Sequence, residues 1–284
     1  MTERAEFPPI VSLADRVPLS SGATMPRLGL GTYKSAEGRE VVSEVTAGLE
    51  LGYRGIDTAS LYGNEVGVGR AIAESGVPRG ELFVATKVWN DDQGYRATLD
   101  AFDRSLEKLR MDYVDLYLIH WPIPELMAAT WRAMEEIYES RRARTVGVCN
   151  FLAHHLEELC AVATVPPAVN QVEHHPHLQQ PQLREYCRDK GVVLQAWAPV
   201  MRGRVFDVPI LVEIAERHGV TPAQVSIRWI LQHEVTTIPK SVHSERVREN
   251  ADVFGFELPP ADMAAIDALD RGERMGPDPD RFAF

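Results

Sequence analysis

Four residues of this chain have side chains that could together carry out acid–base chemistry: Asp57, Tyr62, Lys87 and His120. Asp57 and His120 close strand-like runs, Lys87 lies near the end of another, and Tyr62 follows the first run in a loop. Apolar strands that end in ionisable groups usually bring these groups to the mouth of an α/β fold, where chemistry is done. The set combines a phenol that can give a proton, a cation to acidify it, a carboxylate to hold the cation and an imidazole to orient a carbonyl.

Taken one at a time, these residues have ordinary structural explanations. Asp57 could cap the next turn, and Tyr62 could be a packing residue. His120 could be a histidine at a strand end whose ring nitrogens are hydrogen-bonded to the protein. Lys87 is harder to explain, because it lies in an apolar run and burying an unpaired ammonium is costly. It is therefore the joint occurrence of the four residues, and not any one of them, that indicates acid–base chemistry.

The elements that must position these residues alternate along the chain. Strand candidates and helical patterns follow one another from about residue 28 to 254, which predicts a parallel sheet. Eight strands are the number that closes a (β/α)8 TIM barrel of about 250 residues, and a doubly wound open sheet is the competing α/β architecture. The strand candidates are residues 28–33, 54–57, 81–87, 114–120, 144–149, 168–172, 192–197 and 235–239, and the helical patterns include 101–109, 128–138, 152–161 and 222–231.

Shorter segments flank this alternation at both ends. Residues 17–27 are typical of a small β-hairpin, which could plug the floor of the barrel. Residues 259–269 predict a short C-terminal helix, and a proline-rich strap follows at 276–280. Because the chain has no low-complexity linker and no exact repeat, residues 1–284 are predicted to form a single domain.

Composition and charge limit the partners of the protein. Hydrophobic residues make up 45% of the chain, and the formal net charge of −11 argues against nucleic acid or an anionic membrane as partner. No apolar stretch approaches the ~20 residues of a membrane span, and residues 1–4 lack the layout of a signal peptide. Cys149, Cys160 and Cys187 form no CxxC pair, which is typical of reduced thiols in a cytoplasmic protein.

Two glycine-rich segments invite a dinucleotide-binding interpretation, but residues 29–34 and 67–72 both lack the third glycine of the Rossmann fingerprint. A different signature lies at residues 238–250. Lys240 ends a strand candidate, Ser241 can cap the following helix, and Arg246 falls on the first turns of that helix. A helix N-terminus beside two cations suits a phosphate, although a capped helix with one solvated arginine explains the same pattern.

Taken together, these segments closely resemble the aldo-keto reductase family. The matching motifs recur in the order of that family across nearly the whole chain, and within the family the chain is most similar to small bacterial members that resemble diketogluconate reductases. The matching segments are residues 28–33 (LGLGTY), 55–65 (GIDTASLYGNE), 86–89 (TKVW), 118–122 (LIHWP), 146–151 (VGVCNF), 170–173 (NQVE) and 238–250.

This resemblance implies NADPH-dependent reduction of small aldehydes and ketones at the C-terminal mouth of a TIM barrel. Tyr62 would be the general acid, and Lys87 would favour its phenolate by up to ~4 kcal/mol, roughly three pKa units. Asp57 would keep Lys87 charged and in place. His120 would donate a hydrogen bond to the substrate oxygen. The family also leads us to expect a monomer.

The resemblance further implies how the nicotinamide end of NADPH is held. Asn150 and Gln171 would bind the carboxamide, and Trp197 would stack on the ring, where many family members have tyrosine. Cys149 stands where the family usually has serine and is a weaker hydrogen-bond donor, so we expect a modest loss of cofactor affinity. The loop at 200–209 looks shorter than in members that clamp the cofactor with a long belt, which makes faster cofactor exchange plausible.

At the other end of the cofactor, Lys240, Ser241 and Arg246 would hold the 2′-phosphate and Asn250 would reach the adenine, which predicts NADP over NAD. The complete set of expected cofactor contacts is Thr32, Tyr33, Asp57, Cys149, Asn150, Gln171, Trp197, Ala198, Val200, Lys240, Ser241, Val242, Arg246, Glu249 and Asn250.

The substrate pocket would be walled by aromatic residues. In this family Tyr33, Trp89 and Trp121 would line it together with His120, which favours carbonyl compounds with an apolar portion; core packing is the alternative for Trp89. Phe282 and Phe284 could fold over the site, but we prefer the interpretation that these C-terminal residues belong to a flexible tail.

Three histidines at residues 174, 175 and 177 invite a metal-site interpretation. Adjacent residues of a strand point to opposite faces, and no carboxylate or cysteine at suitable spacing completes the ligand set, so we expect no metal. Two alternative functions stay open. One is a regulatory NADPH-binding subunit of the kind found in potassium channels, against which the intact set of four residues argues. The other is a metal-dependent barrel hydrolase that uses these histidines.

Overall fold

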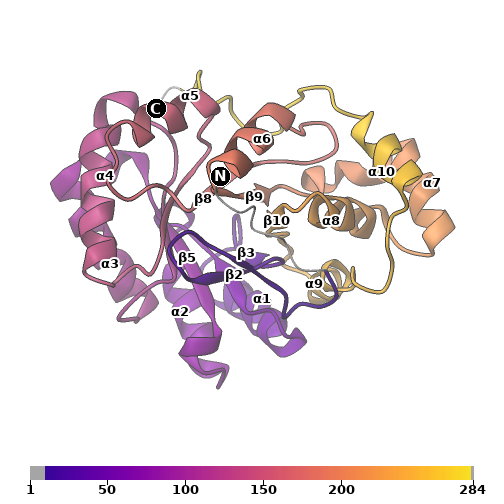
Figure 1. The fold of residues 1–284 in the computed structure, drawn as a ribbon. Coiled ribbons are helices and arrows are strands. Elements are labelled where there is room, and N and C mark those ends of the chain that lie inside the picture. The colour runs from indigo at the N-terminus through magenta and orange to yellow at the C-terminus, as the bar shows by residue number, and fades with distance from the viewer. Residues whose placement is uncertain (1–9, 283–284) are drawn as a thin grey trace.

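The computed structural model describes residues 10–282, and a parallel eight-stranded sheet lies at its centre (Figure 1). The strands follow chain order around the sheet, as consecutive β–α units require. All eight expected strands are present; residues 1–4 and Phe284, considered above, lie outside the described residues. The strands are β3 (Leu30–Gly31), β4 (Gly55–Asp57), β5 (Phe83–Val88), β6 (Leu116–Ile119), β7 (Val146–Cys149), β8 (Val169–Glu173), β9 (Val193–Trp197) and β10 (Thr236–Thr237).

A seam between the first and last strands closes this sheet into a barrel. Leu28 and Thr237 form a parallel bridge, and the backbone N–H of Gly29 donates to the carbonyl of Thr237 at 2.9 Å. Gly31 is required at the seam, because an added Cβ would lie 2.9 Å from the carbonyl oxygen of Ile238. The closed seam confirms the (β/α)8 barrel and excludes the doubly wound open sheet.

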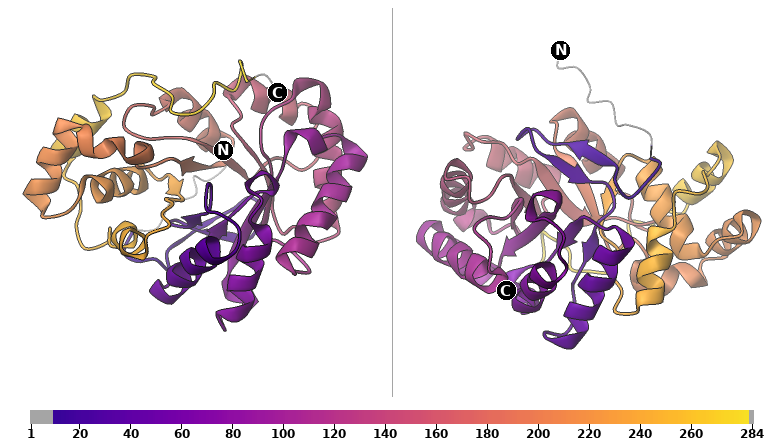
Figure 2. Two further views of the ribbon diagram at one scale, coloured as in Figure 1. Left: turned by 180° about the vertical axis from the view of Figure 1, so that it is seen from behind. Right: turned by 90° about the horizontal axis from the view of Figure 1, so that it is seen from below.

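Helices surround the barrel (Figure 2). They pack on the outward side chains of the strands, among them Val84, Tyr117 and Val148. The helices are α1 (Arg39–Leu51), α2 (Glu65–Glu74), α3 (Tyr95–Leu109), α4 (Pro124–Glu139), α5 (Ala153–Cys160), α6 (Pro181–Asp189), α7 (Pro209–His218), α8 (Pro222–Gln232), α9 (Ser244–Ala251) and α10 (Pro260–Asp267), and short 3-10 turns form η1 (Ser60–Tyr62), η2 (Arg79–Glu81), η3 (Asn90–Asp92) and η4 (Met201–Asp207).

The interior of the barrel changes from apolar to ionisable along the strands. Phe83 and Ala85 of β5 belong to a buried interior cluster, and so do Leu116 and Leu118 of β6. Side chains of a strand alternate between its two faces, so Lys87 must follow Phe83 and Ala85 into the interior, nearer the C-terminal end. His120 follows β6 by the same rule. The period of two thus delivers both groups to the mouth of the barrel.

An antiparallel hairpin covers the opposite end of the barrel, as expected. Its strands are β1 (Arg16–Pro18) and β2 (Thr24–Pro26), and Figure 2 shows this indigo hairpin across the barrel in the view from below. Val17 and Met25 are buried in the same interior cluster as the lower strand residues. The hairpin therefore closes the floor, and the mouth is the end open to chemistry.

After α10 the chain returns across the barrel mouth as the yellow segment of Figure 1 and reaches α5. We call residues 271–282 the strap. None of the helices formed by residues 10–282 is long and apolar enough to cross a membrane.

Candidate active site

Lys87 is the centre of a hydrogen-bonded group at the barrel mouth. Its Nζ lies 2.6 Å from Oδ1 of Asp57, 2.9 Å from the backbone carbonyl of Thr58 and 3.2 Å from the hydroxyl of Tyr62. The lysine side chain is fully buried, and its three ammonium protons have three oxygen acceptors. The geometry thus brings a phenol, a cation and a carboxylate into direct contact.

The position of Tyr62 follows from the turn after β4. The chain enters η1 two residues after the strand and leaves it at Gly63, whose φ of 67° lies in the left-handed region. The ring of Tyr62 then contacts two aromatic rings, that of Tyr33 at 5.0 Å and that of His120 at 5.7 Å between centroids. Trp89 packs edge-on against His120 at 5.2 Å. Tyr33 is 47% exposed, so this aromatic wall is open to the mouth.

Burial governs the electrostatics of this group. Burial alone would lower the pKa of Lys87. The neighbouring Asp57 carboxylate acts in the opposite direction, with smaller contributions from other groups, so the net pKa of Lys87 is raised and the lysine stays charged. Burial raises the pKa of Tyr62, and the attraction of Lys87 offsets only part of this effect. Lys87 therefore favours the phenolate as expected, but burial outweighs it, so the pKa of Tyr62 stays above its usual value. Lys87 limits the energy needed to form a phenolate in a desolvated place.

His120 is a neutral imidazole in this environment. Burial, followed by the charge of Lys87, holds the pKa of His120 well below its usual value. Its Nδ1 has no hydrogen-bond partner among residues 10–282. A buried ring nitrogen without a partner beside a phenol fits a role in contacting a bound molecule.

The residues expected to hold the nicotinamide form one connected network. Gln171 Nε2 donates to Asp57 Oδ2 at 2.7 Å, and the thiol of Cys149 lies 3.7 Å from Gln171 Oε1. Asn150 Nδ2 donates to the carbonyl of His120 at 2.9 Å, and Asn150 Oδ1 accepts from Trp197 Nε1 at 2.9 Å. Burial raises the pKa of Cys149, so it remains a thiol.

This network holds side-chain amides and a flat indole, which are the kinds of group that can contact a carboxamide and a nicotinamide ring. The amide of Asn150 contacts the half-buried indole of Trp197, and Gln171 is linked to the buried ammonium of Lys87 through Asp57. Thr32 is bound to the carbonyl of Asp57 at 3.0 Å, at the end of β3. Ala198 has a left-handed φ of 55°, and Val200 leads into η4, so the short loop at 200–209 is folded into turns.

The residues expected at the 2′-phosphate lie in and after the loop that follows β10. Ser241 does not cap the next helix as expected. That helix, α9, begins at Ser244 with His243 at the capping position, and Ser241 Oγ accepts from the backbone N–H of His243 at 3.1 Å. Lys240 lies beyond β10 and does not end that strand. Both corrections have the same basis, because five loop residues, 238–242, separate the end of β10 at Thr237 from the capping residue His243.

The remaining members of this group lie on or beside α9. Arg246 is exposed in its first turn, and Val242 is half-buried in the loop. Asn250 is buried, and Glu249 accepts a 2.6 Å hydrogen bond from the hydroxyl of Thr221. Two cations and a buried amide in this position fit the phosphate and adenine of NADPH, whereas Glu249 is already bound to the protein.

The three histidines at 174, 175 and 177 turn to different partners. His174 stacks on Trp229 with 5.3 Å between ring centroids, and His175 Nε2 lies 2.9 Å from Glu173 Oε1. His177 accepts two strap N–H groups at its backbone carbonyl. These histidines thus serve packing and the strap.

Sequence reasoning missed how firmly the strap is held. The backbone N–H groups of Met275 and Gly276 both donate to the buried carboxylate of Glu173. At Gly276 an added Cβ would lie 2.5 Å from the ring of Trp197. The glycine before Pro277-Asp278 was the one sequence signal for this close approach.

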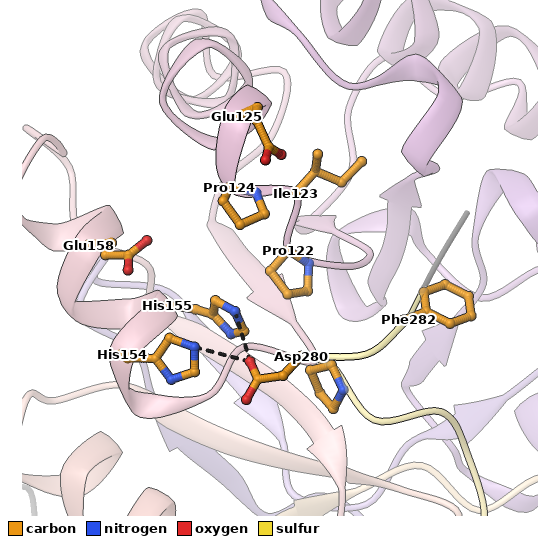
Figure 3. A pocket seen from close by; sticks show the side chains of 10 residues that line it. Pro122, Ile123, Pro124, Glu125, His154, His155, Glu158, Asp280 and Phe282 are labelled. Atoms are coloured by element: carbon orange, nitrogen blue, oxygen red, sulfur yellow. Dashed lines mark ion pairs between the residues drawn. The ribbon is translucent and has the colours of Figure 1, made fainter.

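The end of the strap lies beside α5 and the loop that precedes α4 (Figure 3). The ring of Phe282 packs on Trp121 with 4.4 Å between centroids. The prediction of a flexible C-terminal tail is therefore wrong for Phe282. Asp280 Oδ1 lies 3.1 Å from Nε2 of His154 and 3.4 Å from Nε2 of His155. Phe282, Asp280, His154 and His155 line a cavity of about 410 Å³ between α4 and α5.

His154, His155 and Asp280 could be taken for a metal site, but the hydrogen bonding of His155 opposes this. Its Nδ1 accepts the backbone N–H of Leu152 at 3.1 Å, so the proton of the neutral ring is on Nε2, facing Asp280. A metal would require Nε2 to be free of its proton. The three residues therefore act as a clasp between the strap and α5.

The fold and the site define a TIM-barrel protein with proton-transfer groups at its C-terminal mouth. A family model described as the aldo/keto reductase family matches residues 27–271. The glyoxal reductase of Bacillus subtilis (strain 168) is 53% identical over 273 residues, which cover 96% of this chain and 99% of the relative.

Solved structures agree with this match. An aldo-keto reductase, MGS-M4, from a Medee basin deep-sea metagenome library has a TM-score of 0.92 and 43% identity, and 94% of this chain and 100% of that chain are covered. A Bombyx mori aldo-keto reductase in complex with NADP has a TM-score of 0.87 and 33% identity, with 96% and 97% covered.

The chain belongs to the aldo/keto reductase family and is of the small bacterial type. It is an NADP-dependent oxidoreductase that acts on carbonyl groups, with NADPH/NADP as its cofactor.

Proposed function

We propose that the protein reduces small aldehydes and ketones to alcohols with Tyr62 as the general acid. The observation that carries this proposal is the 3.2 Å contact between the Tyr62 hydroxyl and the buried Lys87 ammonium. NADPH, when bound, supplies the hydride that goes to the carbonyl carbon. Tyr62 gives its proton to the carbonyl oxygen, and the resulting phenolate is stabilised by Lys87.

The neighbouring groups fix the geometry of this proton transfer. Asp57 compensates the charge of Lys87 and holds its Nζ. Neutral His120 donates a hydrogen bond to the substrate oxygen and orients the carbonyl. Tyr33, Trp89 and Trp121 provide an aromatic wall for the apolar part of the substrate.

The cofactor residues support the same proposal. Asn150 and Gln171 bind the carboxamide and Trp197 stacks on the nicotinamide, with Cys149, Thr32, Ala198 and Val200 around them. Lys240, Ser241, Val242 and Arg246 hold the 2′-phosphate, and Asn250 contacts the adenine. This assignment predicts NADPH over NADH.

We also propose that residues 1–284 work as one domain, as a monomer in the cytoplasm, without nucleic-acid partners. The net charge of −11 supports the last point, since phosphate backbones repel an acidic protein.

The test compares wild type with Tyr62→Phe, using loss of 340 nm absorbance with a panel of aldehydes that includes glyoxal, the substrate named for the Bacillus relative. We expect wild-type turnover, and a loss of about 10²–10⁴-fold in kcat with NADPH affinity retained in the variant. Full activity of Tyr62→Phe would end the general-acid assignment. Tight NADPH binding without turnover of any aldehyde by the wild type would favour the regulatory subunit instead.

A further inference from the structure

Glu44 places a buried carboxylate close enough to Lys240 and Ser241 for both to act on its charge. It lies on α1 and is 2% exposed. Its Oε2 accepts a hydrogen bond from the hydroxyl of Ser35, while Oε1 has no hydrogen-bond partner within residues 10–282. A carboxylate oxygen without a partner is costly in a buried place, so its neighbours must decide its charge.

The surroundings of Glu44 bring the pKa of its carboxyl group close to neutral pH. Burial raises the pKa of Glu44 to about 7, against the opposing effects of the Ser35 hydroxyl, the Lys240 ammonium and the backbone N–H of Ser241. Glu40, on the same helix, raises it slightly. Lys240 and Ser241 are thus the groups of the loop that favour the anion.

Two helices, α9 and α2, pack against α1. The charged side chains on these two helices are either exposed to solvent or paired with other residues. On α9, Glu245, Arg246 and Arg248 are exposed, and Glu249 is bound to Thr221. On α2, Glu65 accepts from Thr86 at 2.7 Å and lies 3.7 Å from Lys108, and Arg70 pairs with Glu74 on the surface. Lys240 is therefore the cation through which the charge of Glu44 is balanced.

We propose that Glu44 competes with the 2′-phosphate of NADPH for Lys240 and the Ser241 amide, so that Glu44 takes up a proton when NADPH binds. This inference rests on the proposed assignment of the loop to the 2′-phosphate. Two anions that share one cation in a desolvated place repel each other, and the weaker acid takes the proton. Glu44 is then a residue that sets cofactor specificity through its charge.

The sign of the pH effect follows from linkage. The phosphate makes Glu44 a weaker acid, so the complex binds more protons than the free protein above the pKa of free Glu44. NADPH affinity is then full below about pH 7 and falls as pH rises. NADH has no 2′-phosphate, so its affinity lacks this dependence.

The experiment measures NADPH and NADH dissociation constants for wild type, Glu44→Gln and Ser35→Ala from pH 6.5 to 8.5. For wild type we expect the NADPH constant to rise by up to about eightfold between pH 6.5 and 8 relative to that of Glu44→Gln. Titration of the 2′-phosphate itself, with a pKa near ~6, affects both proteins alike and cancels in this ratio. Ser35→Ala removes the hydroxyl that donates to the Glu44 carboxylate, so the pKa of Glu44 should rise. The pH range over which NADPH affinity falls should then move to higher pH than in wild type.

Calorimetry of wild type in two buffers of different ionisation enthalpy gives an independent result that needs no variant. At pH 7.5 we expect NADPH binding to take up roughly three quarters of a proton, and NADH binding to take up almost none. No proton uptake with NADPH, or equal pH slopes in wild type and Glu44→Gln, would overturn the role of Glu44. If wild type bound NADPH and NADH equally at every pH, the assignment of the loop to the 2′-phosphate would itself be wrong.

Discussion

Gln171 Nε2 donates a 2.7 Å hydrogen bond to Oδ2 of Asp57, although the two residues are 114 positions apart in the chain. The other oxygen of Asp57 holds Lys87 at 2.6 Å. The proposed ligand of the nicotinamide and the proposed support of the general acid therefore share one carboxylate. Any change that frees this carboxylate must affect both cofactor binding and proton transfer.

Gln171→Leu should reduce both NADPH affinity and kcat. Loss of a hydrogen bond to a charged group costs about 1.5–3 kcal/mol, which corresponds to roughly 10–100-fold in kcat if Asp57 loses its orientation. Asn150→Leu is the matched control, because Asn150 bonds to the His120 carbonyl and Trp197 and not to Asp57. It should weaken NADPH binding with a smaller loss of kcat. Equal kcat losses in steady-state kinetics would show that the Gln171–Asp57 bond has no special role.

Lys87→Met should destabilise the protein by about 3–5 kcal/mol, because it leaves the buried Asp57 carboxylate without its cation. The double variant Lys87→Met with Asp57→Asn should recover part of this stability, since no buried charge is then unpaired, but should not recover activity. Urea unfolding measures the stabilities, and the 340 nm assay the activity. An unfolding midpoint of Lys87→Met equal to that of wild type would contradict a buried ion pair.

Arg246→Ala should raise the dissociation constant of NADPH by about tenfold or more and leave that of NADH within about twofold, because a charge-assisted contact to the 2′-phosphate is lost. Arg248→Ala is the control, since Arg248 is also exposed on α9. It should change neither constant by more than about twofold. Fluorescence titration gives all four values, and equal losses for the two cofactors in Arg246→Ala would refute a 2′-phosphate contact.

Asp280→Asn should loosen the clasp between the strap and α5 and free Phe282 from Trp121. Because Asp280 is about half exposed, its ion pairs contribute at most ~1 kcal/mol, so we expect up to about a fivefold rise in KM for apolar aldehydes. NADPH affinity should hardly change. Asp278→Asn removes a strap carboxylate that does not contact the histidines and should leave KM near its wild-type value. The clasp has no effect on substrate binding if both variants show the same KM.

Much of the barrel could be predicted from local pattern. Alternation of strands and helices gave all eight strands, because each buried strand must be apolar and must be separated from the next parallel strand by a helix. The period of two carried Lys87 and His120 into the interior for the same local reason. The start of α9 was predicted too early, because the sequence shows where a cap can form but not how many loop residues precede it.

Contacts between distant segments could not be predicted, because they depend on how the barrel closes. Glu44 looks like one charge on an amphipathic helix, and only the packing of α1 in the folded protein buries its carboxylate within reach of the charge of Lys240. Phe282 lies 161 positions from Trp121 and meets it only because Glu173 turns the strap across the mouth.

By itself the sequence determined the residue types of the site, their order and the strand periodicity that points them to one end of the barrel. The tertiary structure decided their charges. The Tyr62 phenol has a raised pKa, in spite of the adjacent lysine, since the amount of water around a group depends on every segment that covers it. Desolvation is a property of the folded surroundings, and no local pattern contains it.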